Sequence, residues 1–258
     1  MPDFPQGLVE RLLTAERRGP PPVLHLFGEP FVSVDASRVD LPRSCTRLLV
    51  FVALRSGRVE RLYAAGSLWP EHDEARAGGN LRSALWRLNR TRVPLMTSDK
   101  HGLSVRDEVI IDVHAVSAWA TQVIEGAAGA AELRMMPHSL GALDLLPGWY
   151  EDWALIERER LRQRLLHALE AQSRALAHRG LHAEAVEAAM VAVHAEPLRE
   201  SAQRALLEAH LAEGNWVEAR RALALYARLL RRELGVRPAP ELVGLLRRPA
   251  VRETARHG

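Results

Sequence analysis

The sequence predicts an α+β domain followed by an all-α domain, and two observations carry that prediction. The first part of the chain alternates between stretches of period-two hydrophobicity and stretches of helical periodicity, whereas from His114 onward almost every stretch is helical. Glycines 34 residues apart in the second part indicate an internal helical repeat. We therefore predict domains at 23–113 and 114–248, with an N-terminal extension and Pro-rich spacer at 1–22 and a tail at 249–258.

The composition is typical of a globular protein. Of the 258 residues, 47% are hydrophobic and 26% are charged, which is close to the globular average. The single cysteine, Cys45, excludes a disulfide framework and an all-cysteine zinc site. No stretch approaches the ~18 apolar residues of a membrane span, and Glu10 and Arg11 interrupt the apolar run near the N-terminus. We therefore expect a cytoplasmic protein with no membrane contact.

The first domain is predicted to have the order strands, three helices, hairpin. Alternating apolar residues and turn signals predict strands, at Leu24–Leu26, Val32–Val34 and Arg38–Leu41 before the helices and at Leu95–Ser98, Leu103–Val105 and Val109–Val113 after them. Helical periodicity between these strands predicts three helices, at Arg43 to Gly57, Val59–Leu68 and Glu74–Arg92. Asp73 is placed to cap the third helix.

The second domain shows a tetratricopeptide-like repeat. Gly180 and Gly214 are 34 residues apart, the period of that repeat, and LHAEA after the first glycine is answered by NWVEA after the second. The small residues Ala185 and Ala192, and then Pro197, stand where the repeat places close helix contacts and its final proline. Such helix pairs stack into scaffolds that bind proteins rather than perform chemistry.

Charge is distributed unevenly along the chain. The net charge is +3, from 35 basic and 32 acidic residues. Residues 43–92 contain ten arginines and four acids, a net of +6, so the remaining residues sum to −3. Because Lys100 is the only lysine, the high total of arginine is typical of a G+C-rich genome and says little about function. The five arginines without an acid in residues 75–92 are the local block that indicates phosphate binding.

That basic block forms one face of the third predicted helix. On a helical wheel Leu81, Ala84, Leu85 and Leu88 fall in one arc. Most of the arginines fall on the opposite side, and Arg82 and Asn80 flank it. A helix of this kind fits the major groove of DNA, where Arg reads guanine and Asn reads adenine. We expect base contacts from Asn80, Ser83, Trp86 and Arg87 and phosphate contacts from Arg43, Arg47, Arg76, Arg82 and Arg90. The alternative is a solvated surface helix, although such helices normally mix charges of both signs.

The elements around the basic helix have helix-turn-helix geometry. A helix and a turn of several residues precede it, and a hairpin follows it. The hairpin, tipped by Lys100 and His101, is expected either to be a wing that reaches the minor groove or to be an ordinary polar turn. Arg43 and Arg47 begin the first helix, whose N-terminus suits a phosphate. The first domain is therefore predicted to be a winged helix-turn-helix.

No motif indicates an enzyme. The sequence lacks GxSxG, HExxH and CxxC, and Lys100 is not part of a phosphate-binding loop. His178 and His182 have metal-like spacing, but a predicted turn separates them. Three bulky aromatic residues either line a pocket or anchor the first helix of the second domain, and they are Trp149, Tyr150 and Trp153. We predict no catalytic residue, no metal site and no cofactor.

Seven stretches spread over both halves match one known family. They are Leu24–Gly28, Leu41–Leu54, Ala65–Trp69, Gly79–Asn89, Ile111–Val113, Leu145–Arg164 and Glu233–Pro238. In them the chain resembles bacterial transcriptional activators of the antibiotic-regulator (SARP) type. The resemblance implies an OmpR-like winged helix followed by a bacterial transcriptional activator domain of tetratricopeptide-like helices. It also implies an activator that binds direct repeats at promoters, often of secondary-metabolite clusters, and recruits RNA polymerase through its sigma or alpha subunit.

Residues and resemblance together predict a sequence-specific transcription regulator that binds double-stranded promoter DNA and is nucleoid-associated. The helical domain is expected to contact either a second copy on the adjacent repeat or polymerase. Two alternatives stay open: a tetratricopeptide-type interaction scaffold without DNA binding, and a repressor that uses the same DNA-binding residues. The acid-free basic face favours a DNA reader over a scaffold, because a scaffold does not require it.

Overall fold

The computed structural model describes residues 21–35, 37–55, 57–91, 93–135, 141 and 144–246. The chain divides into two units, Met1–Trp119 with Ala142–Gln163 and Ala120–Gly141 with Arg164–Gly258. Most of the predicted extension and all of the predicted tail lie outside the described residues. Within the described residues, no helix combines the length and the hydropathy that a membrane crossing requires.

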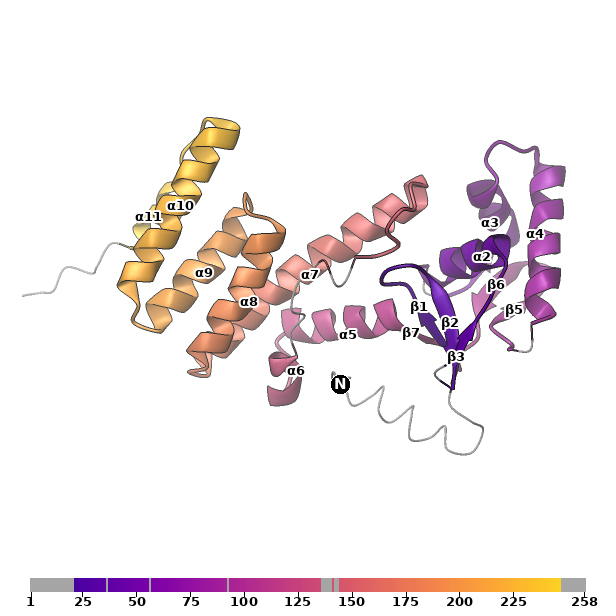
Figure 1. Cartoon of the computed structure of the whole chain (residues 1–258), viewed down its shortest axis with the longest axis horizontal. Helices are drawn as coiled ribbons and strands as arrows, with labels where there is room; N and C mark the ends of the chain where they lie inside the picture. The colour runs from indigo at the N-terminus through magenta and orange to yellow at the C-terminus, as the bar shows by residue number, and fades with distance from the viewer. Residues whose placement is uncertain are drawn as a thin grey trace, which may run out of the picture. The chain divides into compact units, whose positions relative to one another are not determined.

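A four-stranded sheet opens the first unit, in the order β3-β2-β1-β7 (Figure 1). Its strands are β1 (Val23–His25), β2 (Phe31–Val34), β3 (Ser37–Val39) and β7 (Ile110–Ile111). The first three strands pair antiparallel, whereas β7 returns parallel to β1. Leu24, Leu26 and Val32 are buried, as their alternation predicts.

Three helices and a second sheet complete the winged helix-turn-helix. The helices are α2 (Arg43–Ala53), α3 (Arg61–Leu68) and α4 (Glu74–Asn89). The second sheet has the order β4-β6-β5, with strands β4 (Val59–Glu60), β5 (Met96–Ser98) and β6 (Gly102–Val105). The predicted order of strands, three helices and hairpin is therefore confirmed.

At two places the structure has another kind of element than the predicted one. Val59 and Glu60 do not begin the second helix, because they pair with β6 and so form a strand. Asp112 and Val113 do not end a strand but begin α5 (Asp112–Ile124). The carboxylate of Asp112 explains the change, since it accepts a hydrogen bond from the N–H of Val113 at 2.7 Å and another from the N–H of Leu26 at 2.8 Å.

The segment 144–163 returns to the first unit. The N–H of Leu146 donates to the carbonyl of Leu26 at 3.1 Å, and Phe27 forms an antiparallel bridge with Leu145. Further along, the buried ring of Trp153 stands edge-on to the ring of Phe51 in α2, with 5.2 Å between their centroids. This segment therefore belongs to the packing of the sheet and of α2, although the sequence places it after the predicted boundary at residue 113.

Helices form the described part of the second unit, after the end of α5. They are α6 (Ala130–Arg134), α7 (Asp152–His178, in this unit from Arg164), α8 (His182–Ala195), α9 (Glu200–Ala212), α10 (Trp216–Leu234) and α11 (Pro240–Gly244). Gly180 and Gly214 adopt positive φ of 76° and 82° at the turns before α8 and α10. Ala185 and Ala192 are fully buried, which lets the helix backbones approach closely. The predicted helical repeat is therefore confirmed.

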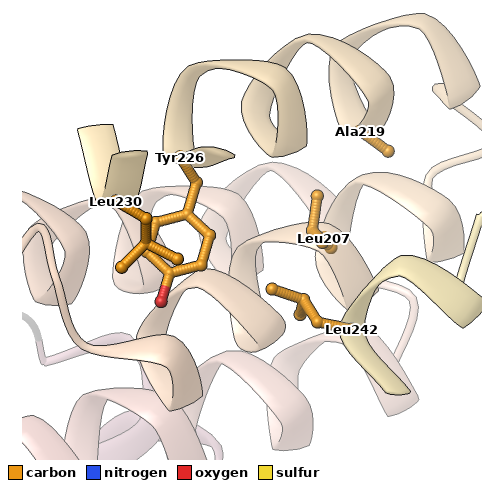
Figure 2. Packing of buried hydrophobic residues seen from close by; sticks show 5 residues of the cluster. All are labelled: Leu207, Ala219, Tyr226, Leu230 and Leu242. Carbon is orange, nitrogen blue, oxygen red and sulfur yellow. The ribbon is translucent and has the colours of Figure 1, made fainter. Parts of the chain in front are cut away.

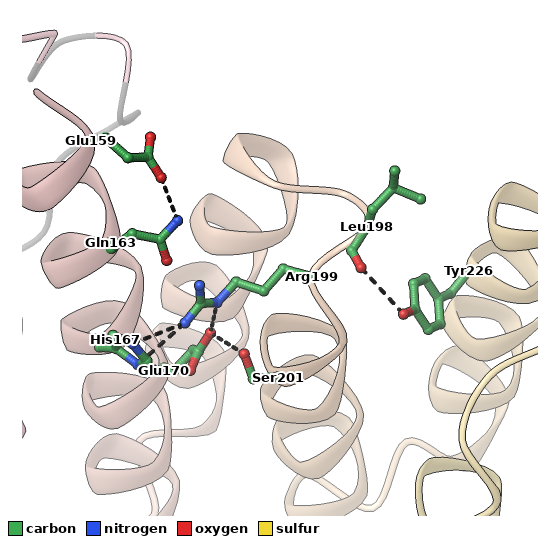
Figure 3. Close-up of polar contacts among 8 residues, drawn as sticks. All are labelled: Glu159, Gln163, His167, Glu170, Leu198, Arg199, Ser201 and Tyr226. Carbon is green, nitrogen blue, oxygen red and sulfur yellow. Dashed lines mark hydrogen bonds and ion pairs between the residues drawn. The ribbon is translucent and has the colours of Figure 1, made fainter. Parts of the chain in front are cut away.

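Two kinds of contact hold these helices together. Figure 2 shows an apolar cluster in which Tyr226 and Leu230 of α10 pack with Leu207 of α9 and Leu242 of α11. Figure 3 shows the buried carboxylate of Glu170 in α7, which accepts hydrogen bonds at 2.6 Å from Nε of Arg199 and at 2.7 Å from the Ser201 hydroxyl. Because an unpaired charge there would be costly, this ion pair fixes the start of α9 against α7.

Candidate nucleic-acid interface

Helix α4 is held in the first unit by one apolar face. Leu81, Ala84, Leu85 and Leu88 are all buried, as the helical wheel predicts. The Cys45 thiol, itself buried in α2, donates to the Ala84 carbonyl at 3.5 Å and so ties the two helices together. Burial raises the pKa of this thiol, although the nearby Arg87 charge opposes the shift. The apolar contacts therefore fix which side of α4 faces solvent.

The N-terminus of α4 is capped as predicted. The side chain of Asp73 accepts a hydrogen bond from the N–H of Arg76 at 2.8 Å. Glu74 is the only acid of α4. It lies in the first turn, where its negative charge interacts favourably with the positive end of the helix dipole. Beyond that first turn the exposed side of α4 is free of acids.

The exposed side of α4 carries most of the predicted contact residues. Those classed as exposed are Arg76, Arg82, Ser83, Trp86, Arg87 and Arg90, while Asn80 is half-buried. Trp86 is 61% exposed, and the guanidinium of Arg90 lies 4.6 Å from the centre of its ring. The stacking restrains both side chains on the outer surface of the helix. A large aromatic ring this exposed is available to a partner.

Small residues in the first turns of α4 leave room for the Arg82 side chain to lie along the helix. A Cβ added at Gly78 would lie 3.6 Å from Nη1 of Arg82, and one at Gly79 would lie 3.8 Å from its Nη2, so this guanidinium runs alongside the glycines. The Ser83 hydroxyl donates to the Gly79 carbonyl at 3.0 Å. Because the hydroxyl proton is used in this bond, Ser83 can act toward a partner only as a hydrogen-bond acceptor.

Two of the predicted phosphate contacts are already in ion pairs. Arg47 in α2 donates to Glu151 at 2.8 Å, and Arg76 lies 3.6 Å from Asp73. Arg43, in contrast, is exposed and makes no ion pair with any described residue. The arginines of this unit are therefore unequal as sites for an incoming anion.

The predicted wing is a tight hairpin closed by Asp99. Its carboxylate accepts hydrogen bonds from the N–H groups of His101 at 2.8 Å and Gly102 at 2.9 Å, and from Nη2 of Arg58 at 2.5 Å. These bonds to the charged form lower the pKa of Asp99 to about 2. Lys100 and His101 are exposed at the tip. The hairpin therefore presents the two side chains that the sequence predicts there.

Sequence reasoning missed how the wing is attached. Arg58 bonds the Asp99 side chain, and Nη1 of Arg61 donates to the Asp99 carbonyl at 3.2 Å. A Cβ at Gly102 would overlap the present position of the Arg58 side chain, so a larger residue there would have to displace that side chain. Both arginines were counted among the basic residues of 43–92. Their contacts with the hairpin depend on the pairing of β4 with β6, which the sequence did not predict.

The aromatic residues at the start of α7 have different surroundings, and the part of the helix that they anchor there belongs to the first unit and not to the second. Trp149 and Trp153 pack edge-on, with 5.8 Å between their ring centroids, and so anchor the start of α7. Trp149 also lines a pocket of about 370 Å³ with Phe31 and Arg43. Tyr150 is 80% exposed. Among the described residues, no group of three or more His, Cys, Asp or Glu side chains could hold a metal ion.

Comparison with known proteins agrees with this architecture. Residues 114–248 match the family model of the bacterial transcriptional activator domain. The chain is 34% identical over 217 residues to the regulatory protein AfsR of Streptomyces coelicolor, covering 78% of this chain and 21% of that protein. It is 31% identical over 218 residues to the regulatory protein AfsR of Streptomyces griseus, covering 78% and 22%. The chain thus spans about a fifth of the length of these relatives.

A solved structure shows the same fold. Mycobacterium tuberculosis EmbR, in complex with a low-affinity phosphopeptide, matches with a TM-score of 0.62 at 18% sequence identity. The match covers 87% of this chain and 64% of that chain. At this identity the likeness is one of fold.

Proposed function

The chain belongs to the family defined by the bacterial transcriptional activator domain, as a SARP-type regulator, and on that premise we propose that it binds double-stranded promoter DNA through α4 and regulates transcription. One observation carries the proposal: Arg82, Arg87 and Arg90 share the solvent side of a helix whose opposite side is buried. An acid-free arginine face on the second helix of a helix-turn-helix is the arrangement that enters the major groove.

The structure supports different tasks for different residues. We assign base contacts to Asn80, Ser83, Trp86 and Arg87 and phosphate contacts to Arg43, Arg47, Arg76, Arg82 and Arg90. Arg47 and Arg76 would have to share their carboxylate partners with a phosphate, so we rank them below Arg82 and Arg90. Lys100 and His101 at the wing tip would reach the neighbouring minor groove.

We further propose that the protein is an activator acting in the cytoplasm at promoters with direct repeats. Direct repeats place two copies head to tail, so a homodimer on them would use two different surfaces of each copy. The helical repeat of the second unit supports a role in protein contact, with RNA polymerase as the other partner. A secondary-metabolite gene cluster is the proposed setting. A repressor with the same DNA contacts is distinguished by a promoter-reporter assay with and without the protein.

Fluorescence anisotropy with promoter duplexes at several salt concentrations tests DNA binding. We expect the logarithm of the affinity to fall with the logarithm of salt, with a slope of about −0.9 per neutralised phosphate. Arg87→Ala should cost about 1–3 kcal/mol and relax selectivity at one base pair. The exposed Arg174 of α7 provides a matched control, and Arg174→Ala should leave DNA affinity unchanged. A flat salt response, or equal affinity for scrambled duplexes, would rule out a sequence-specific reader.

A further inference from the structure

Helix α10 carries a second arginine-rich face, in the other unit. Its inner side packs through Ala219, Tyr226 and Leu230 into the apolar cluster with α9 and α11 (Figure 2). The outer side is exposed and spans about 140° of the helix. We call this outer side the α10 face, and it consists of Val217, Arg220, Arg221, Ala224, Leu225, Arg228, Arg231 and Arg232. No acid lies among these residues.

The positive charge of the α10 face is only partly neutralised. The two acids of α10 flank the face: Glu218 accepts from Arg221 at 3.3 Å, and Glu233 accepts from Arg232 at 2.7 Å. Three arginines of the face remain, Arg220, Arg228 and Arg231, and none of them makes an ion pair with any described residue. Arg228 and Arg231 are three positions apart on the helix, so their like charges repel one another. An anionic partner would remove that repulsion.

Apolar side chains within the α10 face distinguish a protein from a nucleic acid as that partner. Val217 is 73% exposed and Leu225 is 54% exposed. A phosphate backbone gains nothing from covering them, whereas apolar side chains of a protein bury that surface favourably. The face also lacks the amide and hydroxyl side chains that read base edges. Protein interfaces, in contrast, are enriched in arginine, and their buried core is more apolar than their rim.

We propose that the α10 face docks an acidic amphipathic segment of a protein partner. Carboxylates of that segment lie opposite Arg220, Arg228 and Arg231, and its apolar side chains cover Val217 and Leu225. Arg220 and Arg231 are 11 positions apart on the helix, so the docked segment needs to extend about 16 Å, or three helical turns. The proposal deepens the protein-contact part of the proposed function, and it does not depend on DNA binding by α4.

The test uses the full chain and a fluorescent synthetic peptide of about 14 residues, a length that supplies the three turns. The peptide has Glu on one side and Leu at helical spacing on the other. We expect it to bind, and we expect Arg220→Glu, Arg228→Glu and Arg231→Glu together to weaken binding at least tenfold. Val217→Ser with Leu225→Ser should weaken it about tenfold, because the apolar contact is lost. Circular dichroism confirms that each variant keeps its helices.

Matched probes decide between attraction by charge alone and a specific surface. Arg228→Glu and Arg174→Glu change the net charge equally, and only the first should weaken peptide binding. The proposal is overturned if both weaken it alike, if a shuffled peptide or poly-Glu binds as well, or if no peptide binds. It is also overturned if the α10 variants lose duplex DNA instead of peptide. Arg87→Ala should lower promoter affinity and leave peptide affinity unchanged, so the two proposals fail separately.

Discussion

Helices α4 and α10 both present arginines to solvent, but they differ in what lies between those arginines. On α4 the neighbours are Ser83, the half-buried Asn80 and Trp86, which offer polar atoms and a flat ring. On α10 the neighbours are Val217 and Leu225, which offer only apolar surface. An arginine face without acids therefore indicates an anionic partner, while the residues between the arginines indicate whether that partner is a nucleic acid or a protein.

The leucines of the two helices give the largest expected difference. Leu85 of α4 is buried, and Leu85→Ala should lower the free energy of unfolding by about 3 kcal/mol, because it leaves a cavity. Leu225 of α10 is exposed, and Leu225→Ala should change it by less than about 0.5 kcal/mol. Urea denaturation measures both. Equal losses would mean that the outer side of α10 is packed against other groups.

The arginines of the two helices are compared by their effect on DNA. Arg82→Ala, Arg87→Ala and Arg90→Ala together should lower promoter affinity about hundredfold and reduce the salt slope by about 2 to 3. The corresponding set on α10, Arg220→Ala, Arg228→Ala and Arg231→Ala, removes the same charge and should leave both quantities unchanged. Anisotropy titration of the two variants side by side is the measurement. A reduced salt slope in the α10 set would place DNA on both helices.

The wing gives the smallest expected effect. Asp99→Asn removes the charge that holds the Arg58 guanidinium and two backbone N–H groups, so amide exchange at His101 and Gly102 should become faster. The folded-state pKa of about 2 lies below the ordinary value of 3.8. Asp99 therefore stabilises the hairpin above pH 3.8 and loses this contribution as the pH falls toward 2.

The difference between wild type and Asp99→Asn should accordingly shrink as the pH falls from 4 to 2. The measurement is amide hydrogen exchange at His101 and Gly102, followed by NMR at pH 5 and at lower pH. Asp107→Asn, at an exposed position of a neighbouring turn, is the matched control. A difference that stays constant with pH would show that the shape of the side chain, and not its charge, holds the turn.

Sequence reasoning succeeded where a periodicity alone determines the outcome. The inward side of α4 followed from the spacing of Leu81, Ala84, Leu85 and Leu88, because a helix with one apolar stripe has one way to bury it. The repeat of Gly180 and Gly214 likewise located two turns between helices. Both signals lie within a short stretch of chain, so no tertiary contact was needed to interpret them.

Contacts between distant residues could not be predicted in this way. Strand β4 is too short to have a periodicity and exists through its pairing with β6. The bond between Arg47 and Glu151 joins residues 104 positions apart. The sequence therefore showed that Arg47 is a cation but not that a carboxylate lies beside it. The α10 face was hidden because the net charge of −3 outside residues 43–92 averages its arginines with acids elsewhere.

The return of residues 144–163 to the first unit has a consequence for synthesis on the ribosome. The chain emerges from its N-terminus, so Leu26 and Phe51 are made long before Leu146 and Trp153, their partners in the finished fold. At about 5–20 residues per second, the last segment follows residue 113 by several seconds, during which apolar surface of the unit is open to chaperones or aggregation. A gene fusion cut at residue 113 would make that exposure permanent, so a chimera that borrows this unit has to carry the segment up to residue 163.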